Sequence, residues 1–170
     1  MILIDLQTIL TYLTLISVPV GVFYHIMTLR NTRRNQELQL ETRQAQLYMG
    51  LINTLRSPEF RRQWHMAEAA EWEDFNDFST KYSAENNPDI LSAFTSVWAF
   101  FESVGTLVKK GLIDVSLVDG FLAGSIVLAW RWFEPLLMGD REHFGANLWA
   151  DFEYVYHEIM KRGDYRIPDS

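Results

Sequence analysis

The chain has 170 residues, of which 48% are hydrophobic and 14% aromatic, and it contains no cysteine. Its 15 basic and 22 acidic residues give a net charge of −7. The apolar fraction excludes a disordered chain, and the lack of cysteine excludes disulfide scaffolds, thiolate metal sites and cysteine nucleophiles. The acidic balance argues against nucleic acid as a partner.

The first segment, residues 1–29, predicts a transmembrane helix. Leu6 to Leu29 contain no Asp, Glu, Lys or Arg over 24 residues. As a helix this stretch would be about 36 Å long, enough to cross a hydrocarbon core of about 30 Å. A cleaved signal peptide is disfavoured, because no basic residue precedes Arg30 and no small-residue cleavage pattern follows.

Three basic residues follow the apolar segment at once: Arg30, Arg33 and Arg34. The positive-inside rule then places the C-terminal side in the cytoplasm and the N-terminus outside. We therefore expect a single-pass protein of the cell inner membrane. The same arginines could also bind anionic lipid headgroups, and the sequence leaves both roles open.

Residues 30–56 predict a juxtamembrane helix that continues the span, since they contain no proline. An interaction stripe follows a partial heptad repeat in this segment, although Glu41 interrupts it and the run is too short to secure a coiled coil. Its face could pack on the chain's own body or on another chain. The interaction stripe consists of Leu38, Ala45, Tyr48, Ile52 and Leu55.

Residues 57–163 predict a cytoplasmic helical bundle of about four helices, and residues 164–170 a tail. Ser57, Pro58 and Glu59 are typical of a helix start. An apolar helical period runs from Ile90 to Val108, and Lys109-Lys110-Gly111 ends it. No segment alternates as a strand, so the predicted fold class is all-α.

The later helices are marked by their capping and breaking residues. Asp114 can cap the next helix, which Pro135 ends or kinks. Gly120 and Gly124 are spaced for close contact between helices. Gly139-Asp140 predicts a turn, and a last helix is expected from about Phe144 to Arg162.

No motif for a nucleophile elbow, a phosphate loop, a dinucleotide fold or a zinc protease occurs, so no catalytic, cofactor-binding or metal-ligating residue is predicted. His65 with Glu68, and Glu153 with His157, share helix faces, but they lack the spacing of a di-iron bundle. Glu102 lies in an apolar helix and needs a partner, for which Arg131 is the candidate in a structural ion pair.

The order of these segments resembles a prokaryotic family of small membrane-anchored helical proteins, catalogued only as a domain of unknown function. The resemblance rests on the N-terminal apolar helix, on FFESVGTLVKKGLIDVSLV at residues 100–118 and on FEYVYHEI at residues 152–159. Glu102, Gly105, Gly111 and Asp114 match its recurring positions. The resemblance supports fold and location, and it implies no catalytic residue.

The function expected from these features is that of a non-enzymatic, membrane-anchored interaction protein, an accessory or scaffolding subunit of a membrane protein complex. Its partners would be membrane lipid and either that complex or further copies of the chain, with no cofactor and no nucleic acid. Two alternatives stay open: a homo-oligomeric sensor of lipid or membrane state, and a metal-binding bundle that uses the two histidine–carboxylate pairs.

Overall fold

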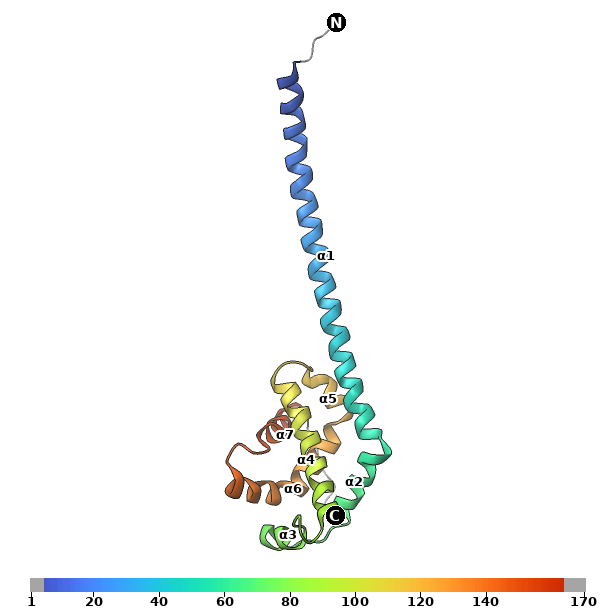
Figure 1. The fold of residues 1–170 in the computed structure, drawn as a ribbon, viewed down its shortest axis with the longest axis vertical. Coiled ribbons are helices and arrows are strands. Elements are labelled where there is room, and N and C mark those ends of the chain that lie inside the picture. Colours follow the sequence, from blue (N-terminus) through green and yellow to red (C-terminus); the bar gives the residue numbers. More distant parts are fainter. Residues whose placement is uncertain (1–4, 164–170) are drawn as a thin grey trace. The chain divides into compact units, whose positions relative to one another are not determined.

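A computed structural model describes residues 5–163, which form seven α-helices and no strand (Figure 1). The predicted all-α class is therefore confirmed. Contacts divide the helices into two compact units, and the division falls within the first helix, between Arg43 and Gln44. The helices are α1 (Leu6–Arg56), α2 (Pro58–Glu68), α3 (Phe75–Lys81), α4 (Pro88–Lys109), α5 (Val115–Phe121), α6 (Ala123–Phe144) and α7 (Ala150–Arg162).

The helix α1 runs for 51 residues and includes Pro19 without a break. Its residues from Leu6 to Arg43 are all exposed except Gly21, which is half-buried. By length and composition α1 and α4 are both able to cross a membrane, as are α5 and α6 together, which meet at 82°. In α1 no part of the most apolar stretch is buried. In α4, 44% of the corresponding stretch is buried. The predicted long apolar N-terminal helix is thus present, and it could span a membrane.

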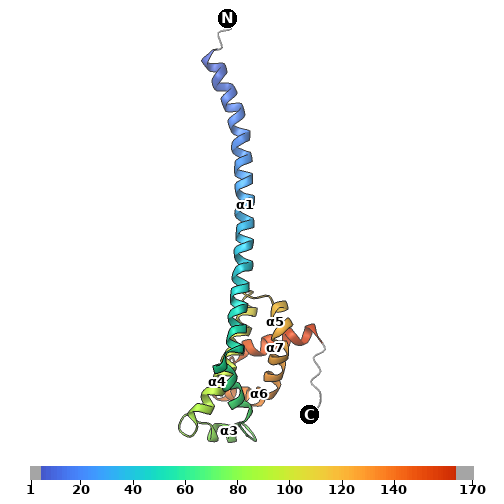
Figure 2. The same ribbon diagram turned by 90° about the vertical axis from the view of Figure 1, so that its right-hand side faces the viewer.

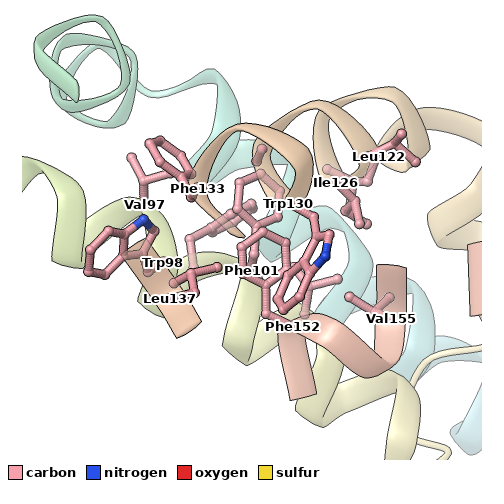
Figure 3. Close-up of a cluster of buried hydrophobic side chains, with 14 of the residues drawn as sticks. Val97, Trp98, Phe101, Leu122, Ile126, Trp130, Phe133, Leu137, Phe152 and Val155 are labelled. Carbon is pink, nitrogen blue, oxygen red and sulfur yellow. The ribbon is translucent and has the colours of Figure 1, made fainter. Parts of the chain in front are cut away.

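The second unit, which begins at Gln44, is organised around α4. Both α2 and α7 pack along α4, and α6 packs against α7, while the short helices α3 and α5 contact α6 (Figure 1 and Figure 2). Aromatic rings fill the space between α4, α6 and α7 (Figure 3). Phe152 lies 4.9 Å from Phe101 and 5.0 Å from Trp130, measured between ring centroids. Aromatic side chains bury large apolar areas, so this cluster stabilises the second unit.

Several predicted helix boundaries are confirmed by their capping geometry. Ser57 accepts a hydrogen bond from the Phe60 amide at 3.1 Å and starts α2. Asp114 accepts one from the Ser116 amide at 2.7 Å and starts α5. Hydrogen bonds from the Ser116 side chain and, second, from its amide lower the pKa of the Asp114 carboxyl. Gly111 follows the end of α4 with φ +65°, a left-handed conformation that glycine adopts without steric cost.

Other boundaries differ from the prediction. Six helices, rather than about four, follow α1 in the described residues, and two of them, α3 and α5, have seven residues each. The helix α6 continues through Pro135 and Gly139 to Phe144, and α7 begins only at Ala150. Leu136 and Leu137 are fully buried just after the proline. Their burial offsets the cost of about 3 kcal/mol that proline imposes inside a helix. The predicted tail, residues 164–170, lies outside the described residues.

Candidate functional site

The three arginines after the apolar segment, Arg30, Arg33 and Arg34, all lie on α1 and are exposed. Within the described residues none of them forms an ion pair. Their charges are therefore accessible to solvent or to an anionic surface. The geometry agrees with a topological role and with headgroup binding alike.

The interaction stripe is divided between the two units. Leu38 and Ala45 are exposed, whereas Ile52 is only 5% exposed and Tyr48 and Leu55 pack half-buried against the core. Its C-terminal part therefore packs on the chain's own body. Only the N-terminal part keeps an accessible apolar surface, and Leu40 adds to it with 62% exposure.

The most connected polar cluster joins α4 to α7, and we call it the α4–α7 junction. The Glu102 carboxylate accepts hydrogen bonds from the amides of Phe152 at 2.7 Å and of Asp151 at 3.3 Å. The residue that caps α7, Trp149, provides no side-chain cap of its own. Glu102 thus supplies from α4 the negative charge that a helix N-terminus favours.

Asp151 completes the α4–α7 junction, because its carboxylate on α7 accepts hydrogen bonds from side chains of α4. Its carboxylate accepts hydrogen bonds from the Thr106 hydroxyl at 2.7 Å and from the Lys109 ammonium at 2.5 Å. The bond to Lys109, with the bond to Thr106, holds the pKa of Asp151 below its usual range, and Asp151 in turn raises the pKa of Lys109. Each helix therefore contributes a carboxylate that accepts hydrogen bonds from the other helix.

Gly105 explains why α4 and α7 approach so closely. A Cβ at this position would overlap the backbone carbonyl of Asp151. Glu102, Gly105, Thr106 and Lys109 thus form one face of α4 that receives the first turn of α7. These residues belong to the 100–118 segment, so the recurring motif has a structural explanation.

The predicted ion pair between Glu102 and Arg131 is wrong. Arg131 is exposed on α6 and forms no ion pair within residues 5–163. Glu102 instead uses both carboxylate oxygens on backbone amides. The need for a partner was inferred correctly, but main-chain donors at a helix end cannot be read from side-chain identity.

A second polar cluster fixes the connection between α6 and α7. Arg141, whose side chain is 15% exposed, donates to the carbonyls of Leu148 at 2.7 Å and Trp149 at 3.1 Å, and to Glu153 at 2.7 Å. Trp149 adopts a left-handed conformation with φ 59° and donates its indole N–H to Asp140 at 3.0 Å. Burial raises the pKa of Asp140, and the hydrogen bond from Trp149 lowers it by less. Arg141 therefore stabilises a strained loop.

The two histidine–carboxylate pairs stay apart. His65 contacts Glu68 at 3.1 Å on α2, and His157 lies 3.6 Å from Glu153 on α7. Glu153 is already bound to Arg141. Over residues 5–163 no three His, Asp or Glu side chains form a group that could hold a metal ion.

Sequence reasoning missed the half-buried polar residues that matter most: Thr106, Asp151, Arg141 and Asp140. The available signal was the spacing of Glu102, Gly105, Thr106 and Lys109, which places all four on one helix face. Each of these polar groups contacts another helix or the connection between α6 and α7. The arrangement can hold helices in place.

Comparisons with known proteins agree with this description. No curated protein and no solved structure matched the chain. The profile of a family described as "Domain of unknown function (DUF4760)" matches residues 2–159, which is most of the chain. The predicted resemblance is thereby confirmed, and the chain belongs to the DUF4760 family.

Proposed function

We propose that the chain is a non-enzymatic, membrane-anchored interaction protein, an accessory or scaffolding subunit of a membrane protein complex. One observation carries the proposal: the apolar N-terminal part of α1 has no buried residue in its most hydrophobic stretch. Side chains such as Leu13, Ile16 and Val20 are more than 60% exposed. A surface of this kind is stable only in lipid or against another apolar surface.

The proposed orientation is single-pass in the cell inner membrane, with the N-terminus outside and the helical body in the cytoplasm. Arg30, Arg33 and Arg34 support it, because they are exposed and directly follow the apolar stretch. The acidic Asp5 precedes that stretch. The proposed single span assigns α4 to the core of the body instead, since its apolar side packs against α2 and α7.

The proposal of a binding rather than a catalytic role rests on the polar groups of the body. Glu102, Asp151 and Thr106 hold α4 to α7, and Arg141 with Glu153 holds α6 to α7. Each of these groups already serves a structural contact. The accessible apolar surface near Leu38 and Leu40 is the feature that such contacts do not explain.

A second candidate is a homo-oligomeric sensor of lipid or membrane state. It is favoured by the combination of exposed leucines, Leu38 and Leu40, with exposed arginines on the same helix. The metal-binding alternative has less support, because its two residue pairs lie on different helices.

The composition of the native particle tests the proposal. The full chain is extracted from its own membrane in mild detergent, and the intact particle is weighed and its components identified by mass spectrometry. We expect a reproducible second protein in the particle. It should be lost when Leu38 and Leu40 are both replaced by Gln, and it should remain in the control variant Met49→Gln, whose site is also exposed. A homo-oligomer alone would favour the sensor, and a monomer would contradict both.

Topology is tested with single cysteines, because the chain has none of its own. A maleimide that cannot cross the membrane is added to intact cells that produce Asp5→Cys or Ser79→Cys. Both positions are exposed. Labelling of Asp5→Cys in intact cells, and of Ser79→Cys only after lysis, is the expected result; the reverse pattern contradicts the orientation.

A further inference from the structure

A pocket of about 340 Å³ opens between the last turn of α1, the helix α2 and the start of α6. This volume lies within the range of small-molecule sites, about 300–1,000 Å³. The residues that matter for its chemistry are Arg56, Phe60, Arg61, Trp64, His65 and Ser125.

The pocket concentrates positive charge in a chain whose net charge is −7. Within the described residues the side chain of Arg61 has no hydrogen bond or ion pair. The guanidinium of Arg56 lies 4.9 Å from the centroid of the Phe121 ring, a contact that positions it without using its N–H donors. The neighbouring Arg62 differs, because it is paired with Glu59 at 2.6 Å. Two guanidinium groups whose N–H donors have no partner in the described residues therefore border the pocket.

The start of α6 adds to this positive potential. Ser125 lies in the first turn of a 22-residue helix whose N-terminus has no side-chain cap, and its hydroxyl has no partner in the described part of the chain. Helix N-termini attract anions through their free amides and dipole. No side chain lies within 4 Å of the position that a Cβ on Gly124 would take, so the backbone there is accessible.

One wall of the pocket is apolar and held in place by the core. Phe60 is 5% exposed and packs against Phe100, with ring centroids 4.7 Å apart. Trp64 packs against Phe101 at 5.6 Å and donates its indole N–H to Glu68 at 2.5 Å. Rings fixed in this way form a preorganised surface for a planar or apolar group.

We propose that this pocket binds a phosphate monoester that carries an aromatic or apolar group. Two guanidinium groups, a hydroxyl and a helix N-terminus suit a dianion better than a carboxylate, which one arginine satisfies. The aromatic wall of Phe60 and Trp64 receives the apolar group. Such a monoester could be a soluble metabolite or the headgroup of a phosphomonoester lipid, and the phosphate chemistry is the same in both.

The test is a calorimetric titration of phenyl phosphate into the full chain, held in nanodiscs of neutral lipid. We expect phenyl phosphate to bind about tenfold more tightly than inorganic phosphate, because the ring adds contacts with the wall. Arg56→Gln and Arg61→Gln should each weaken binding about tenfold or more. The matched control Arg62→Gln lies on α2 with Arg61 but outside the pocket. It should change the affinity for phenyl phosphate by less than about twofold.

A further variant separates loss of the site from loss of the fold. Ser125→Asp places a negative charge in the first turn of α6, where it favours the helix and repels the anion. Its thermal unfolding should be unchanged or shifted upward while phenyl phosphate binding is lost. Undiminished binding in Ser125→Asp would overturn the proposal.

The source of the phosphate is decided by repeating the titration in nanodiscs that contain phosphatidic acid. If this lipid competes with phenyl phosphate and the competition needs Arg56 and Arg61, the ligand is a lipid headgroup. If it does not compete, the ligand is soluble. No binding of phenyl phosphate up to about 10 mM, or equal weakening by Arg62→Gln, would overturn the site altogether.

Discussion

Two helices of this chain, α1 and α4, share the composition of a membrane span but differ in what covers them. In α4, Val97, Phe101 and Val104 are fully buried, and α2 and α7 pack along this helix. In α1, Leu13 and Ile16 are exposed by 61% and 64%. Length and hydropathy therefore identify an apolar helix, whereas burial decides whether its surface still needs a partner.

The cause of the difference lies in the polar residues of each helix. α4 carries a polar face, with Ser92, Ser103 and Glu102 among its members, so one side can meet water or another helix end. The apolar part of α1 has mild polar residues, and Thr11 and Thr14 satisfy their hydroxyls on carbonyls one turn earlier. Such a helix has no side suited to bulk water.

The largest effect is expected from a charge in the buried side of α4. Phe101→Arg places a cation where the side chain is fully buried, and we expect a loss of more than about 4 kcal/mol, enough to unfold the body. Circular dichroism of the purified protein should show no cooperative thermal transition. Membrane fractionation should still recover the chain, because α1 is unchanged. Recovery of Phe101→Arg in the soluble fraction would contradict this expectation.

An arginine in the apolar part of α1 should reduce membrane association and leave the folding of the body unchanged. Ile16→Arg puts arginine in the middle of the exposed apolar stretch, at an insertion cost of about 2.5–3.5 kcal/mol. We expect a lower membrane fraction and an unchanged thermal transition of the body. Asn35→Arg, exposed on the same helix beyond the arginines, is the control and should leave both measurements unaltered.

Gly105 tests how tightly α4 must approach α7. Gly105→Ala introduces a Cβ against the carbonyl of Asp151, and we expect it to destabilise the body by about 2 kcal/mol despite the better helix propensity of alanine. Gly124→Ala has open space, so it should be neutral or stabilising by up to about 1 kcal/mol. Thermal unfolding of the two variants in detergent compares them, and equal midpoints would contradict the close approach.

The prediction that Gly120 and Gly124 mark a close helix contact is wrong, since both have open space around the Cβ position. The close contacts occur at Gly105 and at Gly139, which faces the ring of Phe75. Glycine spacing alone cannot separate these cases, because the contact depends on a helix that lies far away in the sequence.

The local features of the body could be predicted because their causes are local. Ser57, Asp114 and Gly111 mark helix ends through hydrogen bonds or dihedral angles of their immediate neighbours. The main-chain partners of Glu102 and Arg141 could not be predicted, since packing of α7 brings these groups close. The pocket beside Arg56 and Arg61 was missed for the same reason.

A smaller effect is expected at Glu102. Glu102→Gln keeps the shape and one acceptor oxygen but loses the charge that the N-terminus of α7 favours, so we expect a loss of about 1 kcal/mol. Glu134→Gln, exposed on α6, is the matched control and should change stability by less than about 0.5 kcal/mol. Denaturant midpoints measure both; equal midpoints would mean that the cap contributes nothing.

The smallest effect is a dependence of stability on pH that has opposite signs at two aspartates. The bond from Lys109 lowers the pKa of Asp151 in the folded state. Its contribution to stability is therefore present above the unfolded value of about 3.9 and is lost as pH falls through the lower folded pKa. Asp151→Asn should remove this acid loss and flatten the stability profile below about pH 4.

Burial gives Asp140 the opposite sign, because it raises the pKa of the folded state above the unfolded value. The folded protein then binds the proton more tightly, so stability should rise as pH falls through the folded pKa toward about 3.9. Asp140→Asn should abolish this rise and leave the acid loss of Asp151 in place. Thermal midpoints between about pH 3 and pH 7 separate the two variants. If both flattened the same part of the profile, the α4–α7 junction and the Trp149 loop would titrate as one unit, and the assignment of separate signs would be wrong.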